Sequence, residues 1–563
     1  RRAAVLSATL DALADLADIR GSAGEGDELR RAAAAISGLT PAEAAALERR
    51  ASRDRAGTEP GFSPHALARL HEVALGGHDL ALIAARAGIP TLLRRLLELE
   101  VASSAEALAL VRQFGVVTLP DLQLALDEGR LKQVGEKTLE QRLRPAAAAL
   151  DMEVRRLTLG RATDLTEAAL GAVARCCPAV DLLTAAGDVR RFEALVSSVV
   201  IVGRASDPAS AIEALSAMPA VDDVRHRAPR RALVLMQQVE VDIRIAAPDD
   251  YGTVLFNATG SRAHLRAVHE RRHQRPRLSP GEEALYAHAG LPFIPPELRE
   301  GSGEVEAAAA GSLPVLLQRE HIRGDLHMHT VYSDGADTLE AMVAECALIG
   351  YEYIAITDHS ERAGAARTLS RGDVERQRDD IAAVRERYPR MTILHGVEVD
   401  IMPDGRLDFE DAVLETLDIV LASLHDPAHQ DAKRLTARCI RAIRHPLVTV
   451  ITHPANRLVG RRPGYALDFD AVYAAAVETG TALEVDGAPS HLDLDGEHAR
   501  RAAAAGVTLT VDSDCHRFRA LHRQMAFGIG TARRGWVEPG HVLNTRPIAE
   551  VQAFIAAKRR RLA

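Results

Sequence analysis

The front of the chain has the hydrophobic pattern of small helices. From residue 1 to about residue 150, apolar positions recur at helical spacing in stretches rich in Ala, Leu and Arg. Ala is the best helix former, and short Gly or Pro breaks separate the stretches. We therefore expect an N-terminal helical domain at residues 1–60 and a second helical region at residues 61–150.

The next part of the chain mixes strand and helix patterns. Apolar β-branched runs, "LVSSVVIV" and "VEVDIRI", alternate with helical stretches between about residues 155 and 300. This alternation predicts a mixed sheet with helices over residues 151–300. The Gly- and Ala-rich residues 301–322 are the expected linker to the last domain.

After Arg323 the pattern changes to a repeat. Apolar runs recur about every 30 residues, the length of a βα unit, and near-continuous apolar runs are typical of buried parallel strands. The runs are "GDLHMH", "YIAITDH", "ILHGVEVD", "DIVLASLHD", "VTVITHP", "TALEVDG" and "VTLTVDSDCH". They predict a βα barrel of seven strands over residues 323–563. The fold class is thus multidomain, with α+β and α/β parts.

Composition narrows the class of protein. A chain of 563 residues is too long for one core, and its 47% hydrophobic and 26% charged residues are ordinary for globular domains. We see no apolar run of membrane-spanning length and no secretory signal. Five Cys without zinc-finger spacing indicate reduced thiols and a cytoplasmic protein. A net charge of −9 argues against coating nucleic acid by charge alone.

Metal-ligand residues follow six of the seven predicted strands. His327 and His329 share one face of an extended segment, because side chains alternate along a strand. In βα barrels the ends of the strands meet at one rim, where active sites lie. The candidate residues there are His327, His329, Asp334, Asp358, His359, Glu398, Asp400, His425, His453, Asp514 and His516. So many donors exceed the needs of one ion and predict two or three divalent ions. Nitrogen-rich ligation favours manganese, zinc or iron.

These motifs resemble those of the PHP domain, the polymerase-and-histidinol-phosphatase family of phosphoesterases. The resemblance covers residues 323–563 and implies a distorted seven-stranded barrel with a trinuclear metal centre. It implies that Glu398 bridges metals and that Asp358 orients a ligand; we assign catalytic roles to Glu398, Asp358 and His359. The implied ligands are His327, His329, Asp334, His359, Glu398, His425, His453, Asp514 and His516.

A loop rich in arginine follows His453. The stretch "THPANRLVGRRPGY" carries Arg457, Arg461 and Arg462. A guanidinium fork suits a phosphate, whereas solvated loop arginines are an equally good interpretation. We favour Arg457 and Arg462 as phosphate- or DNA-binding residues, because the related bacterial enzymes carry arginines in this loop.

The resemblance extends to the front half. The stretch "GLPFIPPELREGSGEVEAAAAGSLP", running into "IRGDLH", resembles the join between a family-X DNA polymerase core and its PHP domain. The stretch "FNATGSRAHL" resembles the core segment that contacts the sugar of the incoming nucleotide. The whole chain therefore resembles bacterial family-X DNA polymerases, which pair a gap-filling polymerase with a 3′–5′ exonuclease. This resemblance implies a nucleotidyltransferase-like palm and thumb at residues 151–300.

The polymerase motif is incomplete in this sequence. Polymerase chemistry needs three carboxylates that hold two magnesium ions. In "GDVRRFEALVSSVVIV", Gly187, Arg190 and Arg191 match the family pattern, whereas Asp188 replaces a serine that would cradle phosphate. Ser198 and Val200 occupy the positions of two of the carboxylates, and only Asp242 remains. We predict that magnesium binding and templated synthesis are lost or very weak.

Helix-hairpin-helix motifs, which bind DNA phosphates through backbone amides, are also degenerate. Partial matches are "EPGFSPHAL" at Glu59, "LELEVASSAEAL" at Leu97 and "GRLKQVGEKT" at Gly129. Plain helical turns explain each of them individually. Only the resemblance makes residues 61–150 a degenerate helix-hairpin-helix region.

The leading hypothesis is a metal-dependent DNA 3′–5′ exonuclease that serves DNA repair on a family-X polymerase scaffold. Its expected partner is DNA with gapped or recessed 3′ ends; we expect a monomer that is cytoplasmic, nucleoid-associated and without a membrane partner. Three alternatives stay open: an active gap-filling polymerase with exonuclease, a small-molecule phosphomonoesterase of the histidinol-phosphatase type, and a platform that binds DNA or protein.

Overall fold

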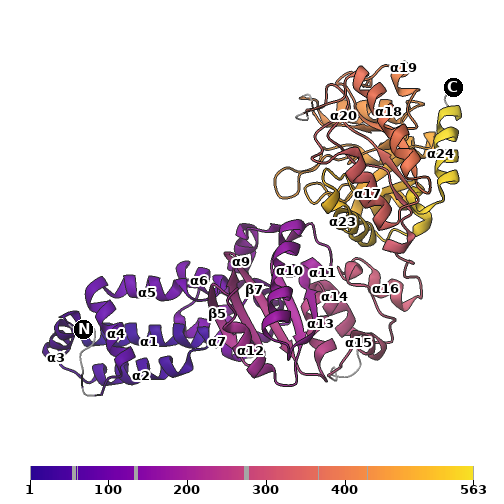
Figure 1. Ribbon diagram of the computed structural model, residues 1–563. Coiled ribbons are helices and arrows are strands. Elements are labelled where there is room, and N and C mark those ends of the chain that lie inside the picture. The colour runs from indigo at the N-terminus through magenta and orange to yellow at the C-terminus, as the bar shows by residue number, and fades with distance from the viewer. Residues whose placement is uncertain are drawn as a thin grey trace.

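The computed structural model describes residues 2–53, 59, 61–131, 137–271, 278–364, 367–427 and 429–561. Figure 1 shows a helical front region, a central sheet covered by helices, and a barrel at the C-terminal end. These three parts follow one another along the chain, as the hydrophobic pattern predicts. The domain boundaries proposed above stay a prediction.

The front region is built of short helices, as expected. Two apolar clusters, one around Leu10 and Ile36 and one around Leu93 and Leu143, form its cores. Its helices are α1 (Arg2–Arg20), α2 (Ala23–Ser37), α3 (Pro41–Arg53), α4 (Pro64–Gly76), α5 (His78–Ala87), α6 (Thr91–Glu98), α7 (Ser104–Phe114), α8 (Leu119–Asp127) and α9 (Lys137–Glu153).

The central part holds a five-stranded mixed sheet with the strand order β2-β4-β7-β6-β5. Alternation along β4 places Val199 and Ile201 in the core under α10 and α12, and Val200 on the other face under α13. Only β4 and β7 run parallel in this sheet. The elements are β1 (Leu157–Thr158), α10 (Leu159–Cys176), β2 (Asp181–Ala186), α11 (Gly187–Arg190), β3 (Leu195–Val196), β4 (Val199–Arg204), α12 (Pro208–Ser216), β5 (Asp223–Ala228), β6 (Arg231–Met236), β7 (Val239–Ala246) and α13 (Tyr251–Thr259).

A small helical unit lies between this sheet and the barrel. Phe256, Leu265 and Tyr286 are buried in its core. Its helices are α14 (Arg262–Glu270), α15 (Glu282–His288) and α16 (Glu304–Ala309).

The C-terminal part is a barrel of seven parallel strands in the order β14-β13-β12-β11-β10-β9-β8, which confirms the predicted repeat. A parallel bridge between Met328 and Cys515 brings the first and last strands together, so the barrel is nearly closed. The strands are β8 (Gly324–Asp325), β9 (Tyr353–Ile356), β10 (Thr392–Asp400), β11 (Ile419–Ser423), β12 (Val450–Ile451), β13 (Ala482–Asp486) and β14 (Leu509–Asp512).

Helices surround the strands of the barrel. Ile354, Val397 and Val420 point from the strands into the layer under these helices. Val551 and Ile555 of the last helix pack against the other strand face, in a cluster with Leu326 and Tyr353. The helices are α17 (Leu339–Ile349), α18 (Arg371–Arg387), α19 (Asp411–Leu414), α20 (Ala432–Ile443), α21 (Phe469–Thr479), α22 (Gly496–Ala504), α23 (Leu521–Arg534) and α24 (Ile548–Arg561).

Helix α23 joins the barrel to the central sheet. The ring of Phe192 packs so closely on Gly530 that a Cβ atom there would lie 2.0 Å from it. Arg534 adds ion pairs to Glu193 at 2.8 Å and to Glu300 at 2.7 Å. Only glycine at position 530 allows this approach. In the part of the chain that the structure describes, no helix is long and apolar enough to span a membrane.

Candidate metal centre

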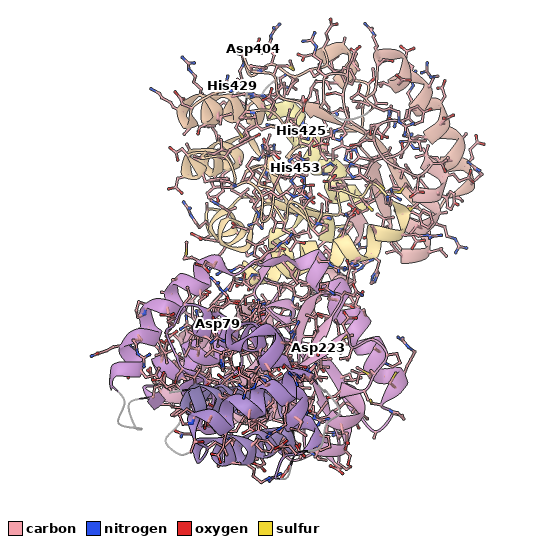
Figure 2. The ribbon with its side chains drawn as sticks, turned by 90° about the vertical axis from the view of Figure 1, so that its left-hand side faces the viewer. Asp79, Asp223, Asp404, His425, His429 and His453 are labelled. Carbon is pink, nitrogen blue, oxygen red and sulfur yellow. The ribbon has the colours of Figure 1, made fainter. Side chains whose placement is uncertain are left out.

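The candidate ligands converge at the C-terminal ends of the barrel strands. His327 follows β8 by two residues, and His425, His453 and Asp514 follow β11, β12 and β14 by the same distance along the chain. Figure 2 shows His425 and His453 close together inside the barrel part. His453 and Asp514 have positive φ angles of 26° and 48°. Such conformations cost energy in residues other than glycine, and are typical of functional sites.

Glu398 lies at the middle of the cluster and is fully buried. Its Oε2 lies 2.9 Å from Nδ1 of His359 and 3.4 Å from Nε2 of His327. Its Oε1 lies 2.9 Å from Nε2 of His453 and 3.3 Å from Nε2 of His425. The two oxygens thus face two different sets of imidazoles, which is the geometry that a bridging carboxylate requires.

Three groups drawn from the predicted ligands are compact enough for an ion, with all donor atoms of a group within 4.8 Å of one another. Adjacent groups share His329 or His359, so the groups form one continuous cluster. Eight of the nine predicted ligands belong to these groups, and the ninth, His453, contacts Glu398. The groups are His329, Asp334, His359 and His516; His327, His329 and Asp514; and His359, Glu398 and His425.

The electrostatics of the cluster fit divalent cations. Burial lowers the pKa of His329 to about 3, helped by neighbouring His516 and His359, so its imidazole is neutral and can bind metal. Burial raises the pKa of Glu398, but His359, His425 and His327 outweigh it and hold that pKa well below its usual range. Glu398 Oε2, His329 Nδ1 and His453 Nδ1 are buried and have no hydrogen-bond partner among the described residues. Converging nitrogen and oxygen donors of this kind suit manganese, zinc or iron.

Two carboxylates outside the predicted ligand set orient the imidazoles. Glu484 Oε1 lies 2.7 Å from Nδ1 of His327, and its Oε2 accepts the backbone N–H of His453 at 2.8 Å. Asp400 pairs with Nδ1 of His425. A carboxylate on the far nitrogen fixes the tautomer and the direction of a metal-binding imidazole. Glu484 lies on β13, the barrel strand for which no candidate ligand was predicted. The alternation of Glu484 and Asp486 along this strand was the sequence signal that could have indicated it.

Asp358 supports the site from behind. Its buried carboxylate accepts hydrogen bonds from the backbone N–H of Thr330 at 2.8 Å, from Ser333 at 3.0 Å, and from Nε2 of Gln377 at 2.6 Å. These bonds hold the turn between His329 and Asp334. These bonds are compatible with the expected orienting role of Asp358, which stays a prediction.

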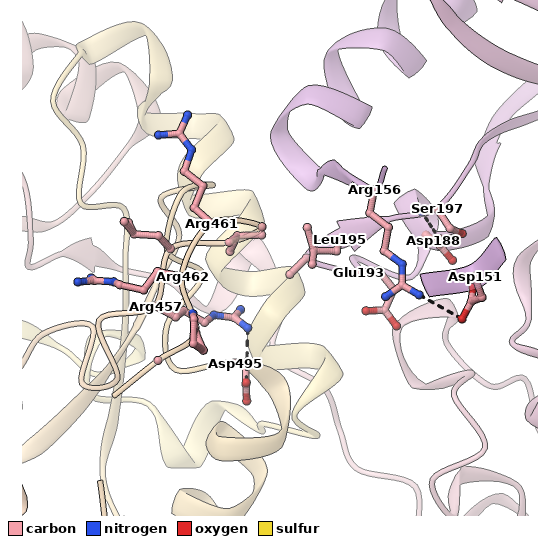
Figure 3. A pocket seen from close by; sticks show the side chains of 16 residues that line it. Asp151, Arg156, Asp188, Glu193, Leu195, Ser197, Arg457, Arg461, Arg462 and Asp495 are labelled. Carbon is pink, nitrogen blue, oxygen red and sulfur yellow. Dashed lines mark hydrogen bonds and ion pairs between the residues drawn. The ribbon is translucent and has the colours of Figure 1, made fainter. Parts of the chain in front are cut away.

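The arginine loop borders a cleft of about 770 Å³ between the barrel and the central sheet (Figure 3). Arg457 donates to the carbonyl of His491 at 2.8 Å and pairs with Asp495 at 3.5 Å. Arg462 donates to the carbonyl of Asn456 at 2.7 Å. In Figure 3 the exposed Arg461 stands clear of the other labelled side chains. The two favoured arginines are therefore engaged in holding the loop, and their phosphate-binding role stays a prediction.

In the predicted remnant of a polymerase site, the carboxylate of Asp242 is bound by arginines. Val200 is the direct strand partner of Asp242, so the two side chains share a face, as the alignment of the motif requires. Arg231 donates to both oxygens of Asp242 at 2.8 Å, and Arg244 donates to Oδ2 at 2.8 Å. Arg231 also pairs with Asp121 of α8 at 2.8 Å. Two guanidinium groups thus surround Asp242, the one carboxylate that the predicted polymerase motif retains.

The arginines of the "GDVRR" motif are also engaged. Arg190 makes two hydrogen bonds to Glu282, at 3.0 and 2.8 Å. Arg191 bonds Glu300 and Asp188, each at 2.7 Å. Asp188 in turn accepts the backbone N–H of Ser197 at 2.7 Å. The motif serves as a set of internal ion pairs, one of which reaches Arg534 of the barrel through Glu300.

Carboxylates also lie at the helix ends of the degenerate hairpins. At "LELEVASSAEAL", Glu106 accepts the backbone N–H of Ser103 at 2.8 Å in a capping box. At "EPGFSPHAL", Ser63 caps α4 and donates to Glu28 at 2.6 Å. The third stretch, at Gly129, includes residues outside the described ones. At these two helix starts an acidic side chain contacts the capping serine, and the helix-hairpin-helix assignment stays a prediction.

Comparisons with known proteins identify a matching family model and several relatives of this chain. Residues 325–448 match the family model "PHP domain". The chain is 36% identical over 389 residues to the DNA polymerase/3′–5′ exonuclease PolX of Bacillus subtilis, covering 66% of this chain and 68% of that protein. It is 30% identical over 257 residues to a probable phosphatase of Thermoanaerobacter sp. (strain X514), covering 42% of this chain and 96% of the relative.

One solved structure shows a distant likeness to part of this chain. It is a histidinol phosphate phosphatase from Lactococcus lactis, determined with zinc, L-histidinol and phosphate. It shares 16% identity with a TM-score of 0.31, covering 38% of this chain and 93% of that one.

Proposed function

This chain belongs to the PolX family of DNA polymerase/3′–5′ exonucleases with a C-terminal PHP domain, and we propose that it is an exonuclease that has lost its polymerase activity. The substrate is DNA with gapped or recessed 3′ ends, and the reaction serves repair-associated trimming. The enzyme acts as a monomer in the cytoplasm, close to the nucleoid. The coarser activity, a metal-dependent phosphoesterase on a PolX scaffold, follows from the family itself.

One observation carries the hydrolytic part of this proposal: nine candidate ligands, with Glu398 at their middle, gather at a single rim of the barrel. Two or three divalent ions bound there would lower the pKa of water and stabilise the charge on phosphoryl oxygens. Glu398 holds two sets of imidazoles in place, and Glu484 keeps His327 in the tautomer that presents Nε2 to the centre. His359 lies between Glu398 and Asp334, with one ring nitrogen facing each carboxylate, and would help to hold the ions on which hydrolysis depends.

The distribution of charged side chains around Asp242 supports the proposed loss of polymerase activity. Ser198 and Val200 offer no carboxylate, and Asp242 is 2% exposed and bound by Arg231 and Arg244. Magnesium would have to displace two guanidinium groups from a buried carboxylate. Breaking a buried ion pair costs about 3–5 kcal/mol, and magnesium binding to a single carboxylate would not offset this cost.

The test uses a primer labelled at its 5′ end, annealed on a gapped duplex, with manganese and the full chain. The expected products are shorter than the primer, both with and without nucleoside triphosphates. The variant Asp514→Asn should leave the primer intact. Extension of the primer would overturn the loss of polymerase activity, and an unchanged primer would overturn the exonuclease.

A second candidate function is favoured by one comparison: the barrel aligns along nearly the whole of a probable phosphatase. The small-molecule phosphomonoesterase would release phosphate from p-nitrophenyl phosphate and leave the primer unchanged. An unchanged primer, with no phosphate released but with retention of DNA in a filter assay, would instead favour the binding platform.

A further inference from the structure

A fourth group of donor atoms lies beside the candidate centre and includes two residues outside the predicted ligand set. Asp486 is the last residue of β13, and His491 lies in the loop after it. Their ligand atoms and one of Asp514 all lie within 4.8 Å of one another. Asp514 thus belongs both to this group and to the group of His327 and His329.

His491 is oriented as a metal-binding histidine is. Its Nδ1 lies 3.0 Å from the carbonyl oxygen of Arg457. A carbonyl only accepts, so Nδ1 carries the proton and Nε2 keeps its lone pair free. Histidine ligands of metals almost always donate their other ring N–H in this way. The ring also stacks on His453, with centroids 5.2 Å apart, which fixes its plane.

Asp486 supplies a buried oxygen that the described residues leave unsatisfied. The residue is fully buried, and one oxygen accepts the backbone N–H of Ala488 at 2.6 Å. The other oxygen has no hydrogen-bond partner among the described residues. Asp514 and Glu484 add to the negative potential around it. A buried carboxylate in such surroundings is costly unless a cation compensates for it.

Asp514 can serve two ions at once. Its contacts with His329 at 3.1 Å, His327 at 3.5 Å and His516 at 3.7 Å are all made by Oδ1. A carboxylate has two oxygens with lone pairs, so Oδ2 remains for a neighbouring ion.

We propose that Asp486, His491 and Asp514 bind an additional divalent cation, zinc or manganese, next to the main centre. Imidazole nitrogens and carboxylate oxygens are both ligands of zinc and manganese in proteins. Three protein donors leave a coordination position open, as catalytic rather than closed structural sites do. The open position is therefore expected to take water or a substrate oxygen.

The test is the number of ions per chain. The full-length protein is stripped with a chelator, reloaded with zinc alone, desalted and measured by elemental analysis, with calorimetric titration of the same samples. Asp486→Asn and His491→Gln should each bind one ion fewer than the unsubstituted chain, with the remaining ions bound as tightly as before. The control is His498→Gln, a half-buried histidine of α22 paired with Tyr473, which should bind the full number.

Circular dichroism and thermal melting establish that each variant is folded. If one of the two substitutions prevents folding, the other still tests the proposal. Variants that keep the full number of ions overturn the proposal. A loss of all ions also overturns it, because the two residues would then belong to the main centre. The primer assay is scored separately: an inactive but fully loaded chain would refute the exonuclease and leave this site standing.

Discussion

Arg231 donates hydrogen bonds to both carboxylate oxygens of Asp242, each at 2.8 Å, and the same guanidinium reaches Asp121 of the helical front region at 2.8 Å. Burial raises the pKa of Asp242, but Arg231 and Arg244 outweigh it and hold that pKa well below its usual range. Asp242 and Arg231 thus tie the front region to the central sheet through Asp121.

Replacement of Arg231 by Met should destabilise this contact. The substitution leaves Asp242, which is 2% exposed, with Arg244 alone, and breaking a buried pair costs about 3–5 kcal/mol. Urea denaturation followed by circular dichroism measures the loss. The control is Arg204→Met in the same sheet, whose pair with Asp181 is exposed and therefore contributes little to stability. Equal losses for the two variants would contradict the role of Arg231.

Replacement of Glu398 by Gln should reduce hydrolysis at least about 100-fold, because both of its oxygens face candidate ligands. The metal content, measured by elemental analysis, should fall by at least one ion. Glu386→Gln, an exposed position on α18, should change neither quantity. Full activity of the Glu398 variant would refute the central position of this carboxylate.

Glu484→Gln tests orientation rather than ligation. The amide can no longer hold His327 with a charged acceptor, so metal affinity should fall about 10–100-fold. Excess manganese should then restore hydrolysis, whereas it should not rescue Glu398→Gln. The measurement is activity against manganese concentration for both variants. If excess manganese restores neither variant, Glu484 does not differ from Glu398 in its role.

The pH dependence of stability should include a contribution from His395. Burial lowers the pKa of this 3% exposed imidazole from 6.5 to about 4. A base with a lowered pKa in the folded state takes up protons preferentially when unfolded, so stability falls as the pH drops below 6.5 and levels off near 4. The loss between pH 7 and pH 5 is about 2 kcal/mol from this group. His395→Gln should flatten the curve by that amount; an unchanged slope in urea titrations at the two pH values would contradict it.

Gly530→Ala should loosen the barrel from the central sheet, because the new methyl group would overlap the ring of Phe192. Limited proteolysis between the two parts should accelerate, and the melting temperature should fall. Gly540→Ala is the matched control, since a Cβ there meets nothing within 4 Å. Identical proteolysis of the two variants would show that α23 tolerates a shift.

Much of the centre could be read from the chain. Seven apolar runs at βα spacing predict a barrel, and parallel strands necessarily end at one rim. Histidines that follow β8, β11 and β12 by two residues must therefore meet, whatever the details of packing. The sequence also predicts that Ser198 and Val200 replace two polymerase carboxylates, because the strand period places both positions on one face; this stays a prediction.

The tertiary structure decided the partners of these residues. Glu484 and Asp486 lie in a strand without a histidine, and nothing in their local sequence states that His327 and His491 lie beside them. Asp242 could have faced solvent or metal; it meets Arg231 from the adjacent strand and, through it, Asp121 from the front region. Strand periodicity determines the face on which a side chain lies, whereas contacts between distant segments depend on how whole elements pack, and this the local pattern does not encode.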